Sequence, residues 1–494
     1  MQKSFKRKWL YGVIGLLLAV ITYNLVPDQE YAKAPMMAAI VVVMAVFWIF
    51  EVVPIPATSL FPLILFPIFG ILDTKSTALF YGKDIIFLFL GGLMLAQGIQ
   101  ESNLHKRIAL HIVNLIGSKP AQLILGFMIA TAFLSMWISN TASVMLMMPI
   151  GISIIEEIKT NDISKKVISK FAVALMLGIA YSADIGGMAT LVGTPPNMVF
   201  SEMYHSLFPN LPKVGFNQWM MIGLPISIIF IFTGWILMTK IIFRIPKHKL
   251  FENKQAIKKI IKELGRLRRD ELLSGLVFLL AAVLWITGSD INISENLKFH
   301  GWRSSFDLKD VSDASIAIGA AILLFIIPSK DKPKETLLTW KKAKTLPWGI
   351  LLLFGGGFAL AGGFTSSGLS NLIGNLFENI SIDSPIIIVA IVCLILTFLT
   401  EITSNTATTN LLLPILAKAS AVLGIDPRYL MIPATLSASC AFMMPVASPT
   451  QAIIFGSGYV KIKQMIRAGI LFNFLGIIIV TSVFFLLSKY VFGI

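Results

Sequence analysis

Apolar runs long enough to cross a lipid bilayer recur along the whole of this chain of 494 residues. Hydrophobic residues make up 56% of the sequence and charged residues only 14%, so most of these runs carry few charges. A helix needs about 20 apolar residues to span the hydrocarbon core, and only helices and closed barrels satisfy their backbone groups there. The sequence therefore predicts an all-α polytopic membrane protein and excludes a soluble fold.

One polar motif occurs twice inside these apolar runs. Residues 133–142 read FLSMWISNTA and residues 398–407 read FLTEITSNTA, so both contain Ser-Asn-Thr. Matching residues also lie upstream, in the stretches 89–98 and 354–363. Polar side chains are unfavourable in hydrocarbon, and internal repeats are typical of transporters whose binding site lies where the repeats meet. The duplication therefore predicts an internal polar site to which both copies contribute.

The positions of Lys and Arg orient the apolar runs, because cytoplasmic loops are rich in both residues. Basic residues are concentrated in the segments 3–8, 106–119, 159–170 and 244–269. These segments share one side of the membrane only if the run 121–158 turns back on itself at its Ser-Asn-Thr motif. We therefore predict that this run is a re-entrant hairpin with Ser139, Asn140 and Thr141 at its tip.

The same count predicts about eleven transmembrane helices and two re-entrant hairpins of opposite orientation, arranged as an inverted repeat. A first span in 1–34 precedes repeat one, which covers 35–244, and repeat two covers 271–494. The basic linker 245–270, which includes an amphipathic stretch, joins the repeats in the cytoplasm. The N-terminus is then cytoplasmic and the C-terminus outside, and the second hairpin, within 385–423, enters from outside.

Each predicted hairpin is followed by a helix that is interrupted. The interruptions read GTPPN at 193–197 and ASPTQ at 447–451. Proline and glycine stop a helix and leave backbone carbonyls and amides without intrahelical partners. Carbonyl and hydroxyl oxygens suit an alkali cation, and amides at helix N-termini suit a carboxylate. Because the nearby helix centres lack Arg and Lys, a small anion would depend on neutral donors, helix dipoles and bound cations.

Two acidic residues lie in apolar segments close to these motifs. Asp184 comes before the Gly186-Gly187 pair and the first interruption, so it is a candidate to tune a cation site or carry a proton. The alternative is a structural hydrogen bond from Asp184 to a neighbouring amide. Glu401, which follows Thr400 in the second hairpin, is a weaker candidate for a direct role.

Other functional classes lack support in the sequence. The formal net charge of +15 comes from basic residues in hydrophilic loops, so it does not indicate nucleic-acid binding. The five histidines have no metal-ligand spacing, and Cys393 and Cys440 lie in apolar segments. No paired catalytic acids or Ser-His pair are recognisable, so we predict neither an enzyme nor a cofactor other than Na⁺ as a coupling ion.

These residues resemble the divalent anion/sodium symporter family, whose members move di- and tricarboxylates or sulfate. The resemblance covers nearly the whole chain and rests on both Ser-Asn-Thr tips, on 193–197 and on the segment SCAFMMPVA at 439–447. It implies an elevator-type homodimer, with scaffold helices to about 120 and to about 384, each followed by a hairpin and broken helix of the transport domain. Asp184 and 448–451 depart from the family pattern, which more often has a small uncharged residue and Thr-Pro-Pro-Asn.

The resemblance also implies which residues bind cations and substrate. One Na⁺ site would involve Ser135, Ser139, Asn140 and Gly193, and a second would involve Thr400, Thr403, Asn405 and Ala447. Substrate carboxylates would contact Ser139, Asn140, Thr141, Ser404, Asn405 and Thr406, with Thr194, Pro195, Ser448 and Pro449 nearby.

The function implied is secondary transport of small dicarboxylates, such as succinate, malate or 2-oxoglutarate, across the cell membrane. The coupling is left open between Na⁺ symport and dicarboxylate exchange. Sulfate, another inorganic anion or citrate is the alternative cargo within the family. An anion channel is the alternative of another class, but opposed hairpins predict a site that opens to one side at a time.

Overall fold

The computed structural model describes residues 2–117, 119–159, 164–246, 260–294, 297–375, 377 and 384–494. Their regular structure is helical, apart from one two-stranded sheet formed by β1 (Ile291–Ser294) and β2 (Leu297–Phe299). The chain divides into two compact units, each built from three segments. Unit 1 contains Met1–Ile86, Pro195–Val214 and Pro347–Ala438, and unit 2 contains Phe87–Thr194, Gly215–Leu346 and Ser439–Ile494.

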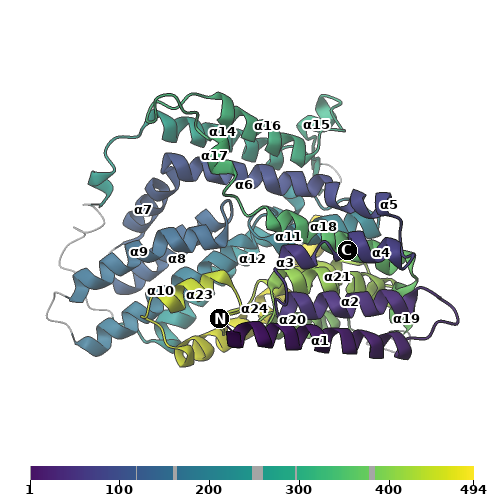
Figure 1. The fold of residues 1–494 in the computed structure, drawn as a ribbon. Coiled ribbons are helices and arrows are strands. Elements are labelled where there is room, and N and C mark those ends of the chain that lie inside the picture. Colours follow the sequence, from purple (N-terminus) through teal and green to yellow (C-terminus); the bar gives the residue numbers. More distant parts are fainter. Residues whose placement is uncertain are drawn as a thin grey trace. The chain divides into compact units, whose positions relative to one another are not determined.

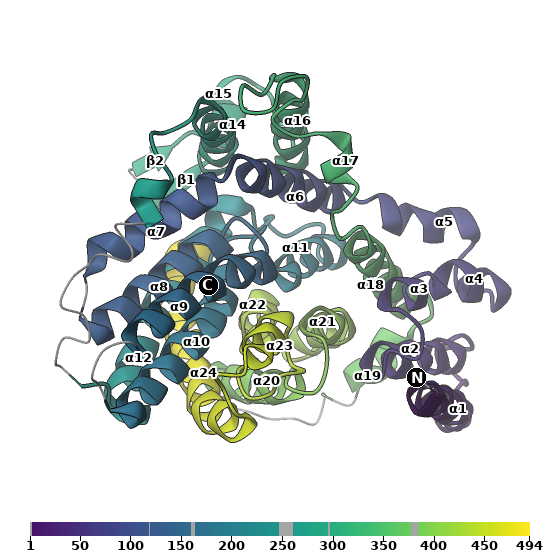
Figure 2. The same ribbon diagram turned by 60° about the vertical axis from the view of Figure 1, so that its left-hand side comes forward.

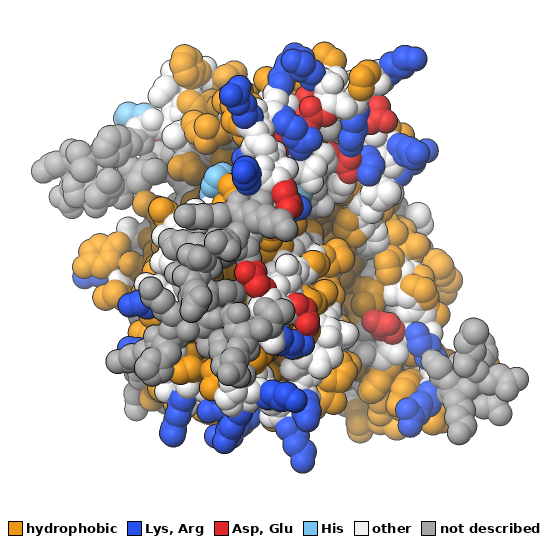
Figure 3. Space-filling model, turned by 90° about the vertical axis from the view of Figure 1, so that its left-hand side faces the viewer, with side chains coloured by type: hydrophobic (Ala, Val, Ile, Leu, Met, Phe, Trp, Pro, Cys, Tyr) orange, Lys and Arg blue, Asp and Glu red, His pale blue; other side chains and the backbone are white. Residues whose placement is uncertain are grey.

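Seven helices among the described residues are long and apolar enough to cross a membrane. The helix α1 (Gln2–Leu25) is one of them, and its side chains Trp9, Leu17 and Leu25 are 68%, 58% and 76% exposed. Figure 3 shows hydrophobic side chains on the described part of one face, between a group of Lys and Arg in its upper part and another along its lower edge. Exposed apolar surface of this extent is expected where lipid replaces water. The prediction of an all-α membrane protein is therefore confirmed.

Unit 1 is built around helices that come from both halves of the sequence. The helix α2 (Ala34–Ile49) packs along α1, and α11 (Pro195–Leu207) packs against α21 (Asn405–Val422) and α22 (Arg428–Ala438). Figure 2 shows α20 (Pro385–Leu399) beside α22. Its other elements are α3 (Ile55–Thr58), α4 (Phe61–Ile68), α5 (Thr74–Leu79), η1 (Phe80–Gly82), α18 (Gly349–Ser366) and α19 (Leu369–Asn375).

The core of unit 1 is closed by apolar side chains of α2, α4 and α18. Met37, Trp48, Phe66 and Leu360 are among its fully buried members. The indole of Trp48 also donates a hydrogen bond to the hydroxyl of Ser59 at 3.1 Å. Because lipid is as apolar as these side chains, close packing and hydrogen bonds, and not exclusion of water, hold a core of this kind together in a membrane.

Unit 2 is organised around α10 (Lys165–Gly187), which is buried along almost its whole length. α10 packs against α8 (Pro120–Ser135), α9 (Asn140–Lys159) and α12 (Phe216–Ile236), as the views in Figures 1 and 2 show. The remaining elements of unit 2 are α6 (Asp84–Ser102), α7 (Leu104–Ile116), η2 (Leu237–Ile242), α14 (Arg269–Ile286), α15 (Trp302–Ser305), α16 (Asp313–Ile326), α17 (Trp340–Ala343), α23 (Pro449–Gly456) and α24 (Ile462–Phe492).

Two sequence predictions differ from the structure or fall outside it. The apolar run 57–72 is split between α3 and α4 instead of forming one helix, because Pro62 is best accommodated at a helix start, and α4 begins at Phe61. Within the predicted linker 245–270, residues 247–259 lie outside the described residues. The predicted amphipathic stretch 256–261 therefore falls mostly outside them as well.

Candidate functional site

The first Ser-Asn-Thr motif lies at a turn between two helices of unit 2. The helix α8 ends at Ser135 and α9 begins at Asn140, so the structure interrupts the apolar run where the sequence predicts. The hydroxyl of Ser139 accepts a hydrogen bond from the amide of Ala142 at 3.3 Å, which satisfies one free amide at the start of α9. The first amides of a helix have no partner within the helix itself, and such amides favour an anion.

The second Ser-Asn-Thr motif occupies the equivalent turn in unit 1. The helix α20 ends at Leu399 and α21 begins at Asn405. The hydroxyl of Thr403 lies 2.8 Å from the carbonyl oxygen of Leu399 and 2.5 Å from the hydroxyl of Thr408. In contrast, Oδ1 of Asn405 is buried and has no hydrogen-bond partner in the described part of the chain. A buried oxygen without a partner costs about 1–3 kcal/mol, so it is suited to receive a ligand.

The carboxylate of Asp184 in α10 is the centre of a hydrogen-bonded cluster in unit 2, which we call the Asp184 cluster. Its Oδ1 accepts from Nδ2 of Asn140 at 3.1 Å, and its Oδ2 accepts from Nε2 of Gln451 at 3.2 Å. The hydroxyl of Thr450 lies 2.8 Å from Oδ2 and 3.1 Å from Oδ1, and that of Ser448 lies 3.3 Å from Oδ2. Asp184 is only 2% exposed, so these neutral donors replace water around a buried acid.

Two glycines let α10 approach the first hairpin closely enough to form this cluster. A Cβ atom on Gly187 would lie 2.7 Å from Oδ1 of Asn140, and one on Gly186 would lie 2.3 Å from the carbonyl oxygen of Ala132. The oxygen of Asn140 accepts a hydrogen bond from the hydroxyl of Ser135 at 2.6 Å. Both ends of the Asn140 amide are therefore engaged within unit 2.

The first interruption lies slightly before the position that the sequence predicts. The helix α10 ends at Gly187 and α11 begins at Pro195, so the interruption covers 188–194 instead of 193–197. Proline is well suited to the first helical position because its missing amide would have no partner there. A Cβ atom on Gly193 would lie 2.5 Å from the carbonyl oxygen of Gly187, which shows how tightly the turn is packed.

The second interruption is longer than predicted. The helix α22 ends at Ala438 and α23 begins at Pro449, so it covers 439–448 instead of 447–451. Ser448 caps α23 by accepting a hydrogen bond from the amide of Gln451 at 3.4 Å. Thr450 and Gln451 thus lie in the first turn of a helix, where their side chains reach Asp184.

The predicted site residues are divided between the two units. Unit 2 contains Ser135, Ser139, Asn140, Thr141, Asp184, Gly193, Thr194, Ala447, Ser448 and Pro449. Unit 1 contains Pro195, Thr400, Thr403, Ser404, Asn405 and Thr406. Within unit 2, the Asp184 cluster brings Ser135, Asn140, Asp184 and Ser448 together. It also includes Thr450 and Gln451, which the sequence analysis had noted only as departures from a family pattern.

The donor set is one that suits an alkali cation better than a transition metal. Among the described residues there is no group of three or more His, Cys, Asp or Glu side chains that could hold a metal ion. The oxygens at the two tips belong to hydroxyl groups, amides and the backbone. Such oxygens are the ligands that bind Na⁺ at broken helices of transporters.

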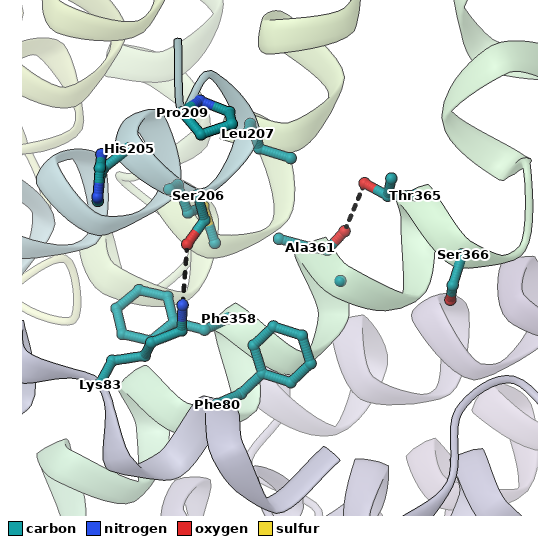
Figure 4. A pocket seen from close by; sticks show the side chains of 12 residues that line it. Phe80, Lys83, His205, Ser206, Leu207, Pro209, Phe358, Ala361, Thr365 and Ser366 are labelled. Atoms are coloured by element: carbon teal, nitrogen blue, oxygen red, sulfur yellow. Dashed lines mark hydrogen bonds between the residues drawn. The ribbon is translucent and has the colours of Figure 1, made fainter. Parts of the chain in front are cut away.

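A separate cavity of about 480 Å³ opens within unit 1 (Figure 4). Nζ of Lys83 lies 3.1 Å from Oε1 of Glu202 and donates a hydrogen bond to the hydroxyl of Ser206 at 3.3 Å. The lining residues are Phe80, Lys83, Met203, His205, Ser206, Leu207, Pro209, Phe358, Ala361, Gly362, Thr365 and Ser366. None of these belongs to the predicted site, and Glu202 already neutralises the charge of Lys83.

Comparison with known proteins identifies the chain as a membrane transporter. Residues 6–493 match the family model described as the sodium:sulfate symporter transmembrane region. The chain is 44% identical over 498 residues to the sodium-dependent dicarboxylate transporter SdcS of Staphylococcus saprophyticus, covering 100% of this chain and 94% of that protein. It is 41% identical over 499 residues to SdcS of Staphylococcus aureus, with the same coverage.

Two solved transporter structures share the fold at low sequence identity. MtrF of Neisseria gonorrhoeae, described as illuminating a class of antimetabolite efflux pumps, aligns with a TM-score of 0.57 and 12% identity, covering 97% of this chain and 94% of that chain. The YdaH transporter of Alcanivorax borkumensis aligns with a TM-score of 0.53 and 11% identity, covering 99% and 98%. The full-length match to the family model is decisive: this chain belongs to the sodium:sulfate symporter family, and it is a multi-pass membrane transporter and not an enzyme.

Proposed function

We propose that this protein is a secondary carrier that moves small dicarboxylates, of the succinate, malate and 2-oxoglutarate class, across the cell membrane together with Na⁺. One observation carries the proposal: the chain is 44% identical, over its full length, to a protein named as a sodium-dependent dicarboxylate transporter. The polar turns support it, because they supply neutral donors and acceptors within otherwise apolar segments.

In this proposal the substrate carboxylates bind at the starts of α9 and α21. Each start follows a Ser-Asn-Thr turn, and the free amides of a helix start favour negative charge. The proposed contacts are Ser139, Asn140, Thr141, Ser404, Asn405 and Thr406, with Thr194, Pro195, Ser448 and Pro449 nearby. A carboxylate held by neutral groups gains further stabilisation from a bound cation, which is a physical reason for coupling to Na⁺.

We propose two Na⁺ sites, one at each turn. The first consists of Ser135, Ser139, Asn140 and Gly193, and the second of Thr400, Thr403, Asn405 and Ala447. Within the part of the chain that the structure describes, Oδ1 of Asn405 is buried without a hydrogen-bond partner. This supports the second site, because a cation would satisfy that oxygen. Asp184 is proposed to influence coupling, and its contact with Asn140 supports a link to the first site.

The membrane arrangement is also a proposal. It has about eleven transmembrane helices and two opposed hairpins in an inverted repeat, with repeats at 35–244 and 271–494. The N-terminus is cytoplasmic, the C-terminus is outside, and two copies form an elevator-type homodimer. The turns at both Ser-Asn-Thr motifs and the distribution of basic residues support this arrangement.

Sulfate is the second candidate cargo, because the family model is described by it. Citrate or another inorganic anion is a related alternative, and an anion channel belongs to a different class. Sulfate and the dicarboxylates both carry two negative charges but differ in the spacing of those charges. Competition between them therefore separates the two candidates.

The test is uptake of radiolabelled succinate into proteoliposomes containing the purified protein. We expect uptake with an inward Na⁺ gradient, little uptake when choline replaces Na⁺, and inhibition by malate but not by equimolar sulfate. If uptake required dicarboxylate inside the proteoliposomes and did not depend on Na⁺, the protein would be a dicarboxylate exchanger and not a Na⁺ symporter. The absence of dicarboxylate uptake both with a gradient and in counterflow would overturn the proposal, and steady single-channel currents would indicate a channel.

A further inference from the structure

The two helix interruptions of this chain differ at the positions that contact Asp184. Where the first reads Thr-Pro-Pro-Asn at 194–197, the second reads Ser-Pro-Thr-Gln at 448–451. The second therefore has Thr450 in place of a proline, which has no side-chain donor, and the longer Gln451 in place of an asparagine. Both replacement side chains donate hydrogen bonds to Asp184.

Four side-chain donors of unit 2 share the carboxylate of Asp184. An ionised carboxylate offers about four lone-pair sites. Four side chains of unit 2 converge on the two oxygens, namely Asn140, Ser448, Thr450 and Gln451, at 2.8 to 3.3 Å. Three of these side chains approach Oδ2, and Oδ1 is approached by Asn140 and by the shared Thr450 hydroxyl. The Thr450 and Ser448 hydroxyls also lie 2.5 Å apart. The contacts described for this carboxylate are therefore contacts with the protein itself.

These donors lie at the starts of two helices, α9 and α23. Their hydrogen bonds to Asp184 connect both helix starts to α10. Asn140 is the first residue of α9, and Ser448, Thr450 and Gln451 form the cap and first turn of α23. Asn140 cannot rotate freely, because its oxygen is held by the hydroxyl of Ser135 at 2.6 Å while its amide is held by Asp184. One carboxylate consequently sets the orientation of an amide at the first hairpin tip and the position of the second interruption.

We propose that Asp184 is a positioning residue of the transport site. In this proposal the hydrogen bonds from Thr450 and Gln451 offset the free-energy cost of burying its carboxylate. Asp184 does not contact the substrate in this proposal. It holds Asn140 and the start of α23 in the arrangement that binds the substrate. The inference rests on the proposed function, because it assigns a role within the dicarboxylate site.

Two pairs of substitutions test the proposal through the KM for succinate. Asp184→Ala removes the acceptor from Asn140, so we expect the KM to rise about tenfold, which is the effect of losing one hydrogen bond to a charged group. Asn140→Ala should raise the KM by at least as much, and the double variant should be no worse than Asn140→Ala alone. Such non-additivity is expected of residues that act through one another.

The second pair tests the partnership with the second interruption. The combined change Thr450→Pro and Gln451→Asn gives that segment the sequence of the first one and removes or shortens two donors to Asp184. We expect this variant to lose most transport, and we expect adding Asp184→Ala to restore part of it, because the acid is then no longer buried with too few partners. Thr131→Val is the matched control, since among the described residues the hydroxyl of Thr131 donates its hydrogen bond to the carbonyl of Phe127 in its own helix.

The outcomes separate this inference from the function on which it rests. If the wild-type protein transports no dicarboxylate, the proposed function fails. If the wild type transports and Asp184→Ala changes only the amount of protein or its thermal stability, with an unchanged KM, the positioning role is overturned. It is also overturned if Asp184→Ala changes the Na⁺ dependence alone, which would identify a cation ligand. Asp184→Asn and Gln451→Met provide milder versions of the same test if the alanine variant does not fold.

Discussion

Nδ2 of Asn140 donates a hydrogen bond to Oδ1 of Asp184 at 3.1 Å, across 44 positions of the chain. Asn140 is the first residue of α9, and Asp184 lies near the end of α10, so this bond ties the tip of the first hairpin to the helix behind it. The approach is close because Gly187 has no side chain. The geometry of the tip therefore depends on residues in α10 as well as on the motif itself.

Gly187→Ala is expected to reduce succinate uptake at least tenfold. Its Cβ atom would lie 2.7 Å from Oδ1 of Asn140, closer than real Cβ contacts, so the Asn140 side chain must move. Gly319→Ala is the matched control in the same unit, because nothing lies within 4 Å of the atom it adds. Alanine favours helix by about 1 kcal/mol over glycine, so this control should keep full transport. Equal uptake by both variants would contradict the packing described for the tip.

Asn140→Ala and Asn405→Ala are each expected to reduce succinate uptake at least tenfold when succinate is well below the wild-type KM. The two residues begin α9 and α21, and each is proposed to bind both Na⁺ and substrate. Asn24→Ala serves as the control, because within the described residues the Asn24 side-chain amide donates to the carbonyl of Val20 in its own helix. Uptake of radiolabelled succinate at matched protein amounts measures the effect. If both site variants took up succinate at the wild-type rate, neither Ser-Asn-Thr motif would be part of the transport site.

The helices and the polar turns were largely predictable from the sequence. Apolar runs and their interruptions depend on local residue order, and proline and glycine mark helix ends by their own stereochemistry. For this reason α9 and α21 begin at the asparagines that the duplicated motif singles out. The predicted interruptions differ from the observed ones by several residues. In a sequence, proline suggests the end of a helix, but here Pro195 and Pro449 are the first residues of the helices that follow.

The Asp184 cluster was not predictable in the same way. Its members come from α8, α9, α10 and the start of α23, and only packing brings them together. The sequence indicated that Asp184 and the segment 448–451 both differ from the family pattern. It did not show that side chains of this segment donate hydrogen bonds to Asp184. A contact between distant residues of this kind requires the fold.

Glu271→Gln is expected to destabilise unit 2 by about 3–5 kcal/mol, the range found when one partner of a buried ion pair is removed. Nε and Nη2 of Arg107 lie 2.9 and 3.2 Å from the two carboxylate oxygens of Glu271, and the side chains are only 10% and 1% exposed. Thermal unfolding of the purified protein in detergent measures the loss.

The exposed pair of Lys309 and Asp307 is the control for that prediction. Its side chains are 74% and 90% exposed and 3.8 Å apart. Exposed pairs contribute about 0–1 kcal/mol, so Asp307→Asn should leave the melting temperature nearly unchanged. Glu271 also accepts from the backbone amide of Arg268 at 3.0 Å and from its Nη2 at 3.3 Å. An unchanged melting temperature of Glu271→Gln would therefore show that the pairs of Glu271 with Arg107 and Arg268 do not stabilise the folded state.

The stability of unit 2 should also depend on pH through Asp270 at the start of α14. Burial of this carboxyl opposes ionisation, but the Ser329 hydroxyl and the Lys330 and Asp331 amides outweigh burial and hold the pKa of Asp270 below its ordinary value. A lowered pKa means that the stabilisation is present above the unfolded-state pKa of about 3.9 and is lost as the pH falls through the folded-state value. Asp270→Asn should therefore melt at a lower temperature than wild type at pH 7, since hydrogen bonds to a charged group contribute about 1.5–3 kcal/mol. The two melting temperatures should approach each other as the pH falls below the unfolded-state value and through the lowered folded-state pKa of Asp270. A difference that stayed constant from pH 7 through the whole acidic range would show that Asp270 stabilises the protein by packing and not by charge.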